Sequence, residues 1–169
     1  MASDPQLPEP WLRGPLAGVH SLVMPVFFSF AQVREDLARH AAGLEREQVW
    51  RMTGANSLGF QLKHIAGSVD RITSYLMEQP LTAAQMEFLR REPSGSEDLP
   101  ALLALVTDSL ARSEDRLRQI DPASIYAVRS VGRRALPTTV IGLLVHLAEH
   151  TQRHLGQAIT LSKLARQTS

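Results

Sequence analysis

The chain has 169 residues, of which 44% are hydrophobic and 21% charged, and it carries 18 basic against 17 acidic side chains. The lack of cysteine excludes a disulfide framework, a cysteine zinc finger, an iron–sulfur cluster and a cysteine nucleophile. With a net charge of +1 and only 5% aromatic residues, the sequence gives no reason to expect binding to nucleic acid or to an anionic membrane.

The N-terminal segment, residues 1–14, contains three prolines and is predicted to be an extended lead-in to a single domain over residues 15–169. It carries two acidic residues where a secretory signal would have a basic start and an apolar run. The longest apolar stretch, residues 16–30, includes His20 and Pro25 and is shorter than the roughly 20 residues of a membrane span. We therefore expect a cytoplasmic protein without a membrane segment.

Helical periodicity appears four times, over about residues 15–42, 57–78, 98–120 and 138–165. The first run contains Pro25, so we expect a kink or a break there. The second run has one apolar stripe with steps of three and four residues, made by Leu58, Leu62, Ile65, Val69, Ile72 and Leu76. Candidate caps precede the later runs: Asn56 or Ser57, the pair Glu97 and Asp98, and Thr138.

Four amphipathic helices in one domain favour an all-α fold, a four-helix bundle. The connections over residues 79–97 and 121–137 are long enough to cross the bundle, so a simple up-down-up-down order is not forced. Residues 82–90 could hold a small extra helix. Residues 125–131 could be extended, but the segment is short.

The fourth run carries VHLAEHTQRHLGQ, which places His146, His150 and His154 four residues apart. Residues with this spacing lie on one face of a helix, so two of these imidazoles can reach one metal ion. The alternative is that the three histidines are simply solvated on the helix surface.

Two pairs of these histidines compete as ligands. His146 to His150 spells HLAEH, a zinc-protease pattern in which Glu149 would be the general base, but no acidic residue follows Glu149 to provide the downstream ligand. At about 100° per residue, His154, His150 and His146 lie about 40°, 80° and 120° from the centre of the apolar stripe. We therefore favour His150 and His154, with His146 pointing more to solvent.

A third ligand must come from another helix, and His20, His40 and His64 are the candidates. His64 lies about 120° from the stripe of its own helix, which is no better than His146. His40 is explained by the C-terminus of the first helix, which favours a cation. The periodicity alone leaves the third ligand open.

The strings LKHIAGS and EHTQRHLGQ resemble the DinB/YfiT-like superfamily of metal-dependent enzymes, which is distinct from the polymerase that shares the DinB name. The resemblance extends from about Trp11 to the end of the fourth helix. It implies a four-helix bundle of up-down-down-up order with a three-histidine site for zinc, nickel or a similar divalent ion. It places the ligands at His64, His150 and His154.

The resemblance also implies an activity. Characterised members include transferases and isomerases that use bacillithiol, mycothiol or another low-molecular-weight thiol, so we expect a small-molecule substrate and a thiol transferase, and a homodimer. Three imidazoles leave a divalent ion at least one open position. Hydrolysis by metal-bound water is the second possibility, and a non-catalytic metal-binding bundle that acts as a sensor or interaction module is the third.

Polar residues near the expected ligands are candidates for supporting roles. Gln61 lies one turn before His64 and could hydrogen-bond toward the site, and Gln157 could orient a ligand. Several arginines could bind an anionic group of a thiol or substrate, with a solvated basic edge as the alternative: Arg129, Arg133, Arg134 and Arg153. Gly156 is expected to permit close helix packing.

Overall fold

Residues 7–167 are described in the computed structural model, and most of them are helical. The α-helices are α1 (Met24–Ala41), α2 (Arg46–Trp50), α3 (Leu58–Leu76), α4 (Ala83–Arg91), α5 (Leu99–Leu117) and α6 (Val140–Gln167). Two 3-10 turns, η1 (Pro10–Leu12) and η2 (Pro122–Ser124), and a hairpin of β1 (Val128–Val131) and β2 (Leu136–Thr139) complete the elements. The all-α prediction is confirmed, with one small antiparallel sheet added.

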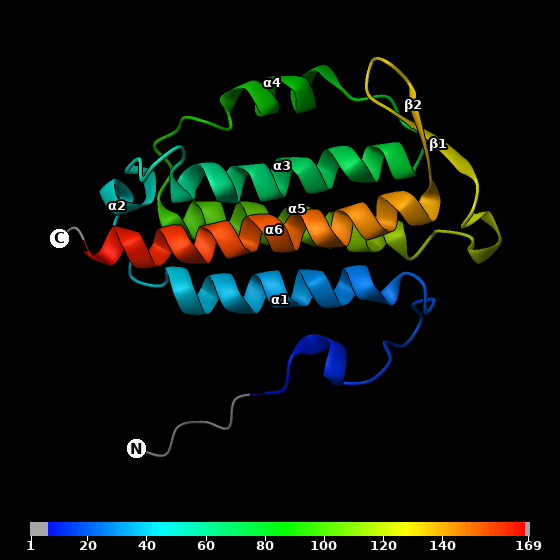
Figure 1. The fold of residues 1–169 in the computed structure, drawn as a ribbon, viewed down its shortest axis with the longest axis horizontal. Helices are drawn as coiled ribbons and strands as arrows, with labels where there is room; N and C mark the ends of the chain where they lie inside the picture. Colours follow the sequence, from blue (N-terminus) through cyan, green and yellow to red (C-terminus); the bar gives the residue numbers. More distant parts are fainter. Residues whose placement is uncertain (1–6, 168–169) are drawn as a thin grey trace.

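The four long helices α1, α3, α5 and α6 pack around one apolar core. Helix α6 lies between α1 and α3, and α5 contacts α3 and α1 on the other side. In Figure 1, α1 and α6 run in one direction and α3 and α5 run in the other. Each helix contributes fully buried side chains to the core, among them Phe30, Leu62, Leu110 and Leu147. This burial is the main source of the stability of the helices.

The first long helix starts later than predicted. Its periodic pattern extends back to residue 15, but Gly18 adopts φ +69, a conformation outside the helical region, so no helix runs through it, and α1 begins at Met24. Pro25 therefore occupies the first turn, where its missing N–H costs no hydrogen bond. The predicted run is therefore broken close to Pro25, as one of the two expected outcomes, and α1 has no internal proline kink.

The other predicted helices match closely, and their caps explain where they begin. Ser57 caps α3 by accepting from the Phe60 N–H at 3.1 Å, and Asp98 caps α5 through the Ala101 N–H at 2.9 Å. At α6 the hydroxyl that accepts from Gly142 N–H, at 3.1 Å, belongs to Thr139 rather than Thr138. The small extra helix expected over residues 82–90 is α4.

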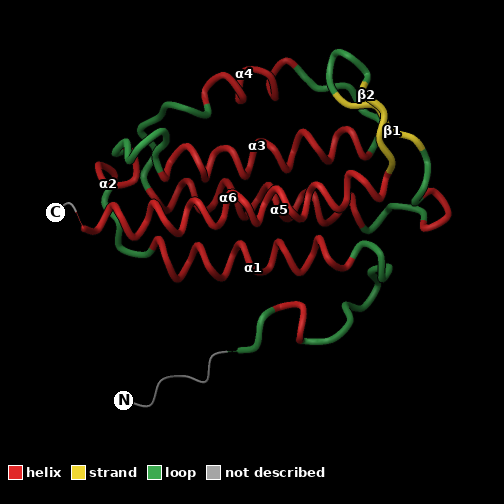
Figure 2. The backbone as a smooth tube through the Cα atoms, in the orientation of Figure 1, coloured by secondary structure: helices red, strands yellow, loops and turns green. Residues whose placement is uncertain are grey.

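Two elements were not predicted. Helix α2 is only five residues long and depends on a capping box, in which Glu45 and Gln48 bond to each other's backbone. Strand β1 falls within the segment suspected to be extended, but its partner β2 lies in a stretch read as a loop and the start of the last helix. Figure 2 shows the hairpin in yellow, at the end of the molecule where α3 ends and α6 begins.

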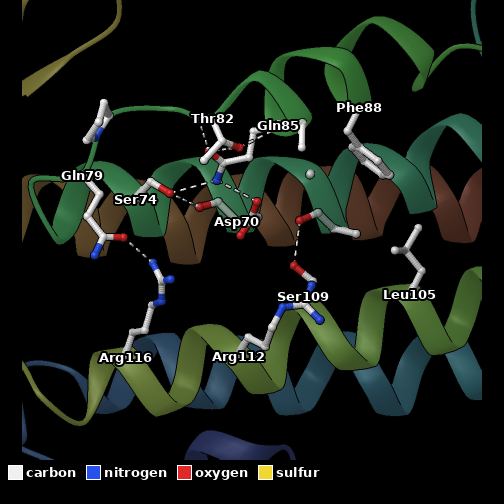
Figure 3. A pocket seen from close by; sticks show the side chains of 14 residues that line it. Asp70, Ser74, Gln79, Thr82, Gln85, Phe88, Leu105, Ser109, Arg112 and Arg116 are labelled. Atoms are coloured by element: carbon white, nitrogen blue, oxygen red, sulfur yellow. Dashed lines mark hydrogen bonds between the residues drawn. The ribbon is translucent and has the colours of Figure 1, made fainter.

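Helix α4 lies along the outer face of α3 (Figure 1). Gln85 joins the two helices through bonds from its Nε2 to Asp70 at 2.7 Å and to Ser74 at 2.9 Å. A cavity of about 430 Å³ lies between α3, α4 and α5, with Arg112 and Arg116 at its α5 side (Figure 3). Because α4 covers the outer face of α3, nearly all of the residues of α3 are buried.

The N-terminal lead-in is described only in part. Residues 1–6 lie outside the described residues. The η1 turn packs against α1, and Arg13 forms an ion pair of 2.6 Å with Glu35 of that helix. Within residues 7–167, no helix has both the length and the apolar character required to cross a membrane.

Two helical glycines give opposite predictions. A Cβ at Gly67 would overlap the Glu92 carboxylate and lie 2.7 Å from a guanidinium nitrogen of Arg71, two groups held in an ion pair. A Cβ at Gly156 meets nothing within 4 Å, so the expected packing role of Gly156 is wrong. We expect Gly67→Ala to lower the free energy of unfolding by about 1–3 kcal/mol and Gly156→Ala to raise it by up to about 1 kcal/mol. Urea unfolding of both variants measures this, and equal effects would contradict it.

Candidate metal centre

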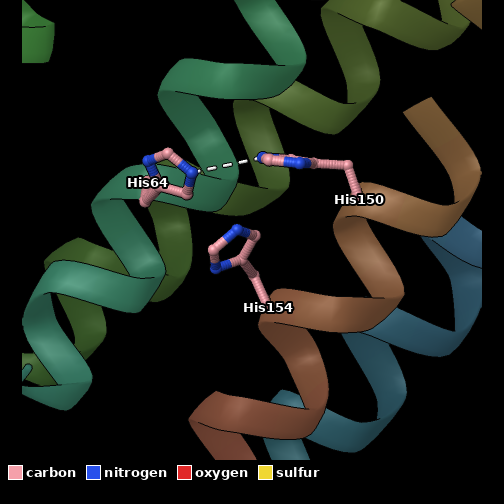
Figure 4. Close-up of side chains that lie close together, drawn as sticks. All are labelled: His64, His150 and His154. Atoms are coloured by element: carbon pink, nitrogen blue, oxygen red, sulfur yellow. Dashed lines mark hydrogen bonds between the residues drawn. The ribbon is translucent and has the colours of Figure 1, made fainter. Parts of the chain in front are cut away.

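Three histidines converge between α3 and α6 (Figure 4). His64 comes from the middle of α3, and His150 and His154 come from successive turns of α6. The Nε2 atoms of His64 and His150 lie 3.2 Å apart, and one ring nitrogen from each of the three residues lies within 4.8 Å of the others. The structure thus brings together the three histidines that were predicted to be the ligands.

The arrangement fits a divalent metal ion. Two nitrogens bound to one tetrahedral zinc at about 2.0–2.1 Å lie about 3.3 Å apart, close to the 3.2 Å between His64 and His150. Imidazole nitrogens suit zinc, nickel, copper and iron. The three rings also crowd together, with the His154 centroid 4.3 Å from that of His64 and 4.5 Å from that of His150.

Two of the histidines are held in the uncharged form. Burial, followed by the proximity of His154, lowers the pKa of His150 to about 4. Burial, followed by the proximity of His64, lowers the pKa of His154 to about 4. Both rings are therefore neutral at pH 7, and protons do not compete with a metal for their lone pairs.

Hydrogen bonds select which ring nitrogen of two histidines is free. His64 Nδ1 lies 2.7 Å from a carboxylate oxygen of Glu92, and His154 Nδ1 lies 2.7 Å from the amide oxygen of Gln61. Both partners are acceptors, so Nδ1 carries the proton and Nε2 presents its lone pair to the site. Among residues 7–167, the buried Nδ1 of His150 has no partner. In the hydrogen bond of 3.2 Å between the Nε2 atoms of His64 and His150, the His64 nitrogen is the acceptor, so without a metal the proton of His150 lies on Nε2.

Glu92 is the candidate site residue that the sequence pattern did not reveal. It ends α4 and is 1% exposed, and its second oxygen accepts from Arg71 at 2.7 Å. The chain beyond it is held by Lys63, whose Nζ donates to the Ser94 carbonyl at 2.8 Å and to Glu97 at 3.1 Å. In the sequence, Glu92 lies among other charged residues at the end of a short helix. No local pattern there indicates that its carboxylate is buried while its neighbours are solvated.

The cover by α4 also explains the burial of His64. On its own helix His64 lies far from the apolar stripe, yet its side chain is only 19% exposed. Phe60 stacks on its ring with centroids 5.4 Å apart, and the Glu92 carboxylate faces Nδ1 from the α4 side. The helical wheel of α3 could not show this, because the covering element is separated from His64 in the sequence.

The remaining histidines lie outside the triad. His146 is 47% exposed and bonds Glu149 at 2.7 Å, in agreement with its predicted orientation toward solvent. Glu149 and His150 could form a second ligand group with His146, but the other Glu149 oxygen is bonded to Arg153. His20 accepts from the Leu22 N–H at 3.3 Å before α1 begins, and His40 lies in the last turn of α1.

The candidate supporting residues separate into two groups. Gln61 bonds the triad directly, as suggested by its position one turn before His64. Gln157 and Arg153 line a cavity of about 530 Å³ that Gln61 also lines but that none of the three histidines lines. Within residues 7–167, Gln157 forms no hydrogen bond with any of the three histidines.

The three arginines of the predicted basic cluster, Arg129, Arg133 and Arg134, have different surroundings. Arg129 donates to the Leu76 carbonyl at 2.9 Å and lies 3.5 Å from Glu78, so it fastens the hairpin to the end of α3. Arg133, at the turn of the hairpin, lines a cavity shared with His64 and His150. Arg134 is exposed and does not line that cavity.

The cavity beside the triad has a volume of about 620 Å³, within the range of small-molecule sites. Its walls come from α3, from α4 and the segment before it, from the hairpin turn and from α6. We name it the triad cavity. It gives a reactant access to His64 and His150, whereas a purely structural metal site is closed by four protein ligands.

Acidification is expected to destabilise the metal-free protein. Histidines of the unfolded chain titrate near 6.5, whereas His150 and His154 titrate near 4 in the folded protein. Between these values the unfolded state binds more protons, so the free energy of unfolding falls as the pH drops. With solvent screening taken into account, we expect a loss on the order of 2 kcal/mol for the two residues together.

Urea unfolding of chelated protein at about pH 7 and pH 5 measures this loss. The double variant His150→Gln/His154→Gln should show a smaller pH dependence, and His146→Gln the normal one. A pH dependence that survives unchanged in the double variant would assign it to other groups.

Comparison with known families agrees with this geometry. A comparison with curated proteins finds no match. The family model of the DinB superfamily matches residues 29–158, which is more than three quarters of the chain and includes all three histidines of the site. A match of this extent, together with the histidine triad between α3 and α6, shows that the chain belongs to the DinB superfamily.

Proposed function

We propose that the protein is a metal-dependent enzyme that holds one divalent ion, zinc or nickel, with His64, His150 and His154, and transfers a low-molecular-weight thiol to an electrophile. The observation that carries the proposal is the convergence of three imidazoles at the wall of an open cavity. When bound, the ion supplies a positive centre with an open coordination position, which favours the thiolate form of a thiol.

The residues of the chain have separate roles in this proposal. His150 and His154 are neutral at pH 7 because of their burial, so they are ready to bind a cation. Glu92 and Gln61 orient the rings of His64 and His154. The protein has no cysteine, so the thiolate must come from a cosubstrate. The apolar part of the cavity wall, which includes Ile72 and Leu89, limits the access of water to the reacting thiolate.

The proposal extends to the architecture and the assembly. We propose that α1, α3, α5 and α6 form the up-down-down-up four-helix bundle of the superfamily, and that the protein is a cytoplasmic homodimer. An apolar groove of about 960 Å³ between the N-terminal segment, α1 and α6 supports the dimer, because Leu22, Phe28 and Val145 line it. Sedimentation equilibrium tests the oligomeric state, and a monomer at all concentrations would contradict it.

The thiol reaction is tested on cobalt-loaded protein. Addition of a low-molecular-weight thiol should produce a sulfur-to-cobalt charge-transfer band in the near ultraviolet, and the thiol should be consumed with an electrophile only when metal is present. His150→Ala should abolish both signals. The control is His40→Ala, which lies outside the site and should retain both.

The failure of this test has a definite meaning. If several biological thiols give no charge-transfer band in protein that demonstrably holds cobalt, the transferase proposal is wrong. Metal-dependent hydrolysis of an ester or amide panel would then indicate a hydrolase. The absence of both reactions would indicate a metal-binding bundle that acts as a sensor or interaction module.

A further inference from the structure

We propose that the triad cavity binds a small amphipathic carboxylate, with its anionic head at Arg133 and its apolar body along α3 and α4. The inference rests on the proposed function, because it names the class of the electrophilic substrate that the same site would take. It depends on three features of the cavity: an uncommitted arginine, an apolar wall and the absence of lining acids.

Arg133 is the arginine that is available to a ligand. Arg133 is exposed like its neighbour Arg134, but it lines the cavity, and among residues 7–167 it has no hydrogen-bond or ion-pair partner. The neighbouring arginines are engaged: Arg129 with Leu76 and Glu78, Arg153 with Glu149, and Arg71 with the buried Glu92. A guanidinium that lines a cavity without a partner is suited to a bidentate contact with a carboxylate.

The hairpin holds Arg133 in place over the cavity. Gly132 and Ala135 adopt positive φ values of 70 and 47 and make the tight turn on which Arg133 lies. The hairpin is fastened to the end of α3 by the bond from Arg129 to the Leu76 carbonyl. It is fastened to the start of α6 by the bond from the Val140 N–H to the Ala127 carbonyl, at 3.0 Å. The hairpin that carries Arg133 is therefore fastened at its base, and Arg133 lies exposed at its turn.

The rest of the cavity wall is mainly apolar. Ile72 contributes from α3, and Leu81, Met86 and Leu89 contribute from α4 and the segment before it. No carboxylate is among the described residues that line the cavity. A fully hydrophilic anion would leave this apolar surface uncovered, and a cation would be repelled by Arg133. An anion with a short hydrocarbon body fits both the guanidinium and the apolar wall.

The proposal is tested by nitrogen–proton NMR titration of metal-free protein with hexanoate. We expect saturable shifts at amides of the cavity wall, such as those of Gly132, Ile72 and Leu89, and no comparable shifts with 1-hexanol or hexylamine. Arg133→Gln should weaken hexanoate binding about tenfold, because it removes a charge-assisted hydrogen bond. Arg134→Gln is the matched control: it removes the same charge from the adjacent exposed residue and should leave the affinity unchanged.

Three results would overturn the proposal: equal binding of hexanoate and 1-hexanol, shifts confined to residues outside the cavity, or equal effects of the two arginine variants. Because the titration uses metal-free protein, its outcome is separate from that of the thiol experiment. A protein that binds hexanoate normally but shows no thiol chemistry would retain this site and lose the transferase proposal. The reverse result would retain the transferase and remove this substrate class.

Discussion

Replacement of His64, His150 or His154 by alanine is expected to strip the metal at micromolar free ion, whereas His146→Ala should bind it almost normally. Loss of an outer-shell partner alone costs about 10–100-fold in metal affinity, so loss of a ligand should cost more than about 100-fold. Competition with a chelating dye, on protein purified without a histidine tag, measures the affinity. His146 is the matched control because it lies one turn from His150 on the same helix and is 47% exposed.

The same variants separate the two possible ligand pairs. Retention of metal by His154→Ala together with its loss from His146→Ala would show that the upstream pair is the site. All the variants should remain folded, because the four long helices bury an apolar core without help from an ion. Chelation of the wild-type protein should accordingly lower its melting temperature without abolishing its helical circular dichroism, unlike a zinc finger, which is unfolded without metal.

Glu92→Leu is expected to have a large effect on stability as well as on metal binding. It leaves the buried Arg71 without a counter-charge, which typically costs about 3–5 kcal/mol in the free energy of unfolding. It also removes the acceptor that orients His64 at 2.7 Å, so metal affinity should fall about 10–100-fold. Urea unfolding measures the first effect and dye competition the second. Glu87→Leu, on the exposed face of the same helix, is the control and should change neither by much.

The double variant Glu92→Leu/Arg71→Leu separates the two roles of Glu92. Removal of both charges leaves no unpaired ion, so much of the lost stability should return. His64 would still have no acceptor for Nδ1, so metal affinity should remain low. Recovery of metal affinity along with stability would show that Glu92 acts on the metal only through the fold.

The extent to which the sequence predicted the fold depends on where each helix receives its burial. Helices α3, α5 and α6 bury their own periodic stripes and carry side-chain caps close to the predicted positions, so they match within a few residues. The segment before α1 is also apolar, but Gly18 has a positive φ there and interrupts the helix. The periodicity of side chains does not reveal such a backbone conformation. The hairpin depends on pairing between residues that share no local pattern.

The same distinction applies to the site. The four-residue spacing and the angle from the apolar stripe together were sufficient to propose His150 and His154, because both features belong to one helix. The angular position of His64 on α3 did not favour it as a ligand, and the family resemblance carried most of the weight in its selection. Its burial comes from α4 and Glu92, which is a tertiary effect that no single-helix argument contains.

Because the three histidines come from two neighbouring helices, the distances between their ring nitrogens depend on how α3 and α6 are aligned along the bundle axis. A slide of α6 past α3 by one residue would move His150 and His154 by about 1.5 Å, whereas metal–ligand distances tolerate only about 0.2 Å. One residue inserted between His150 and His154 would in addition rotate His154 by about 100° around α6. An insertion or deletion between His150 and His154 should therefore weaken metal binding far more than an equal change in the connection between α2 and α3. A bound ion would in this way fix the position of α6 along α3.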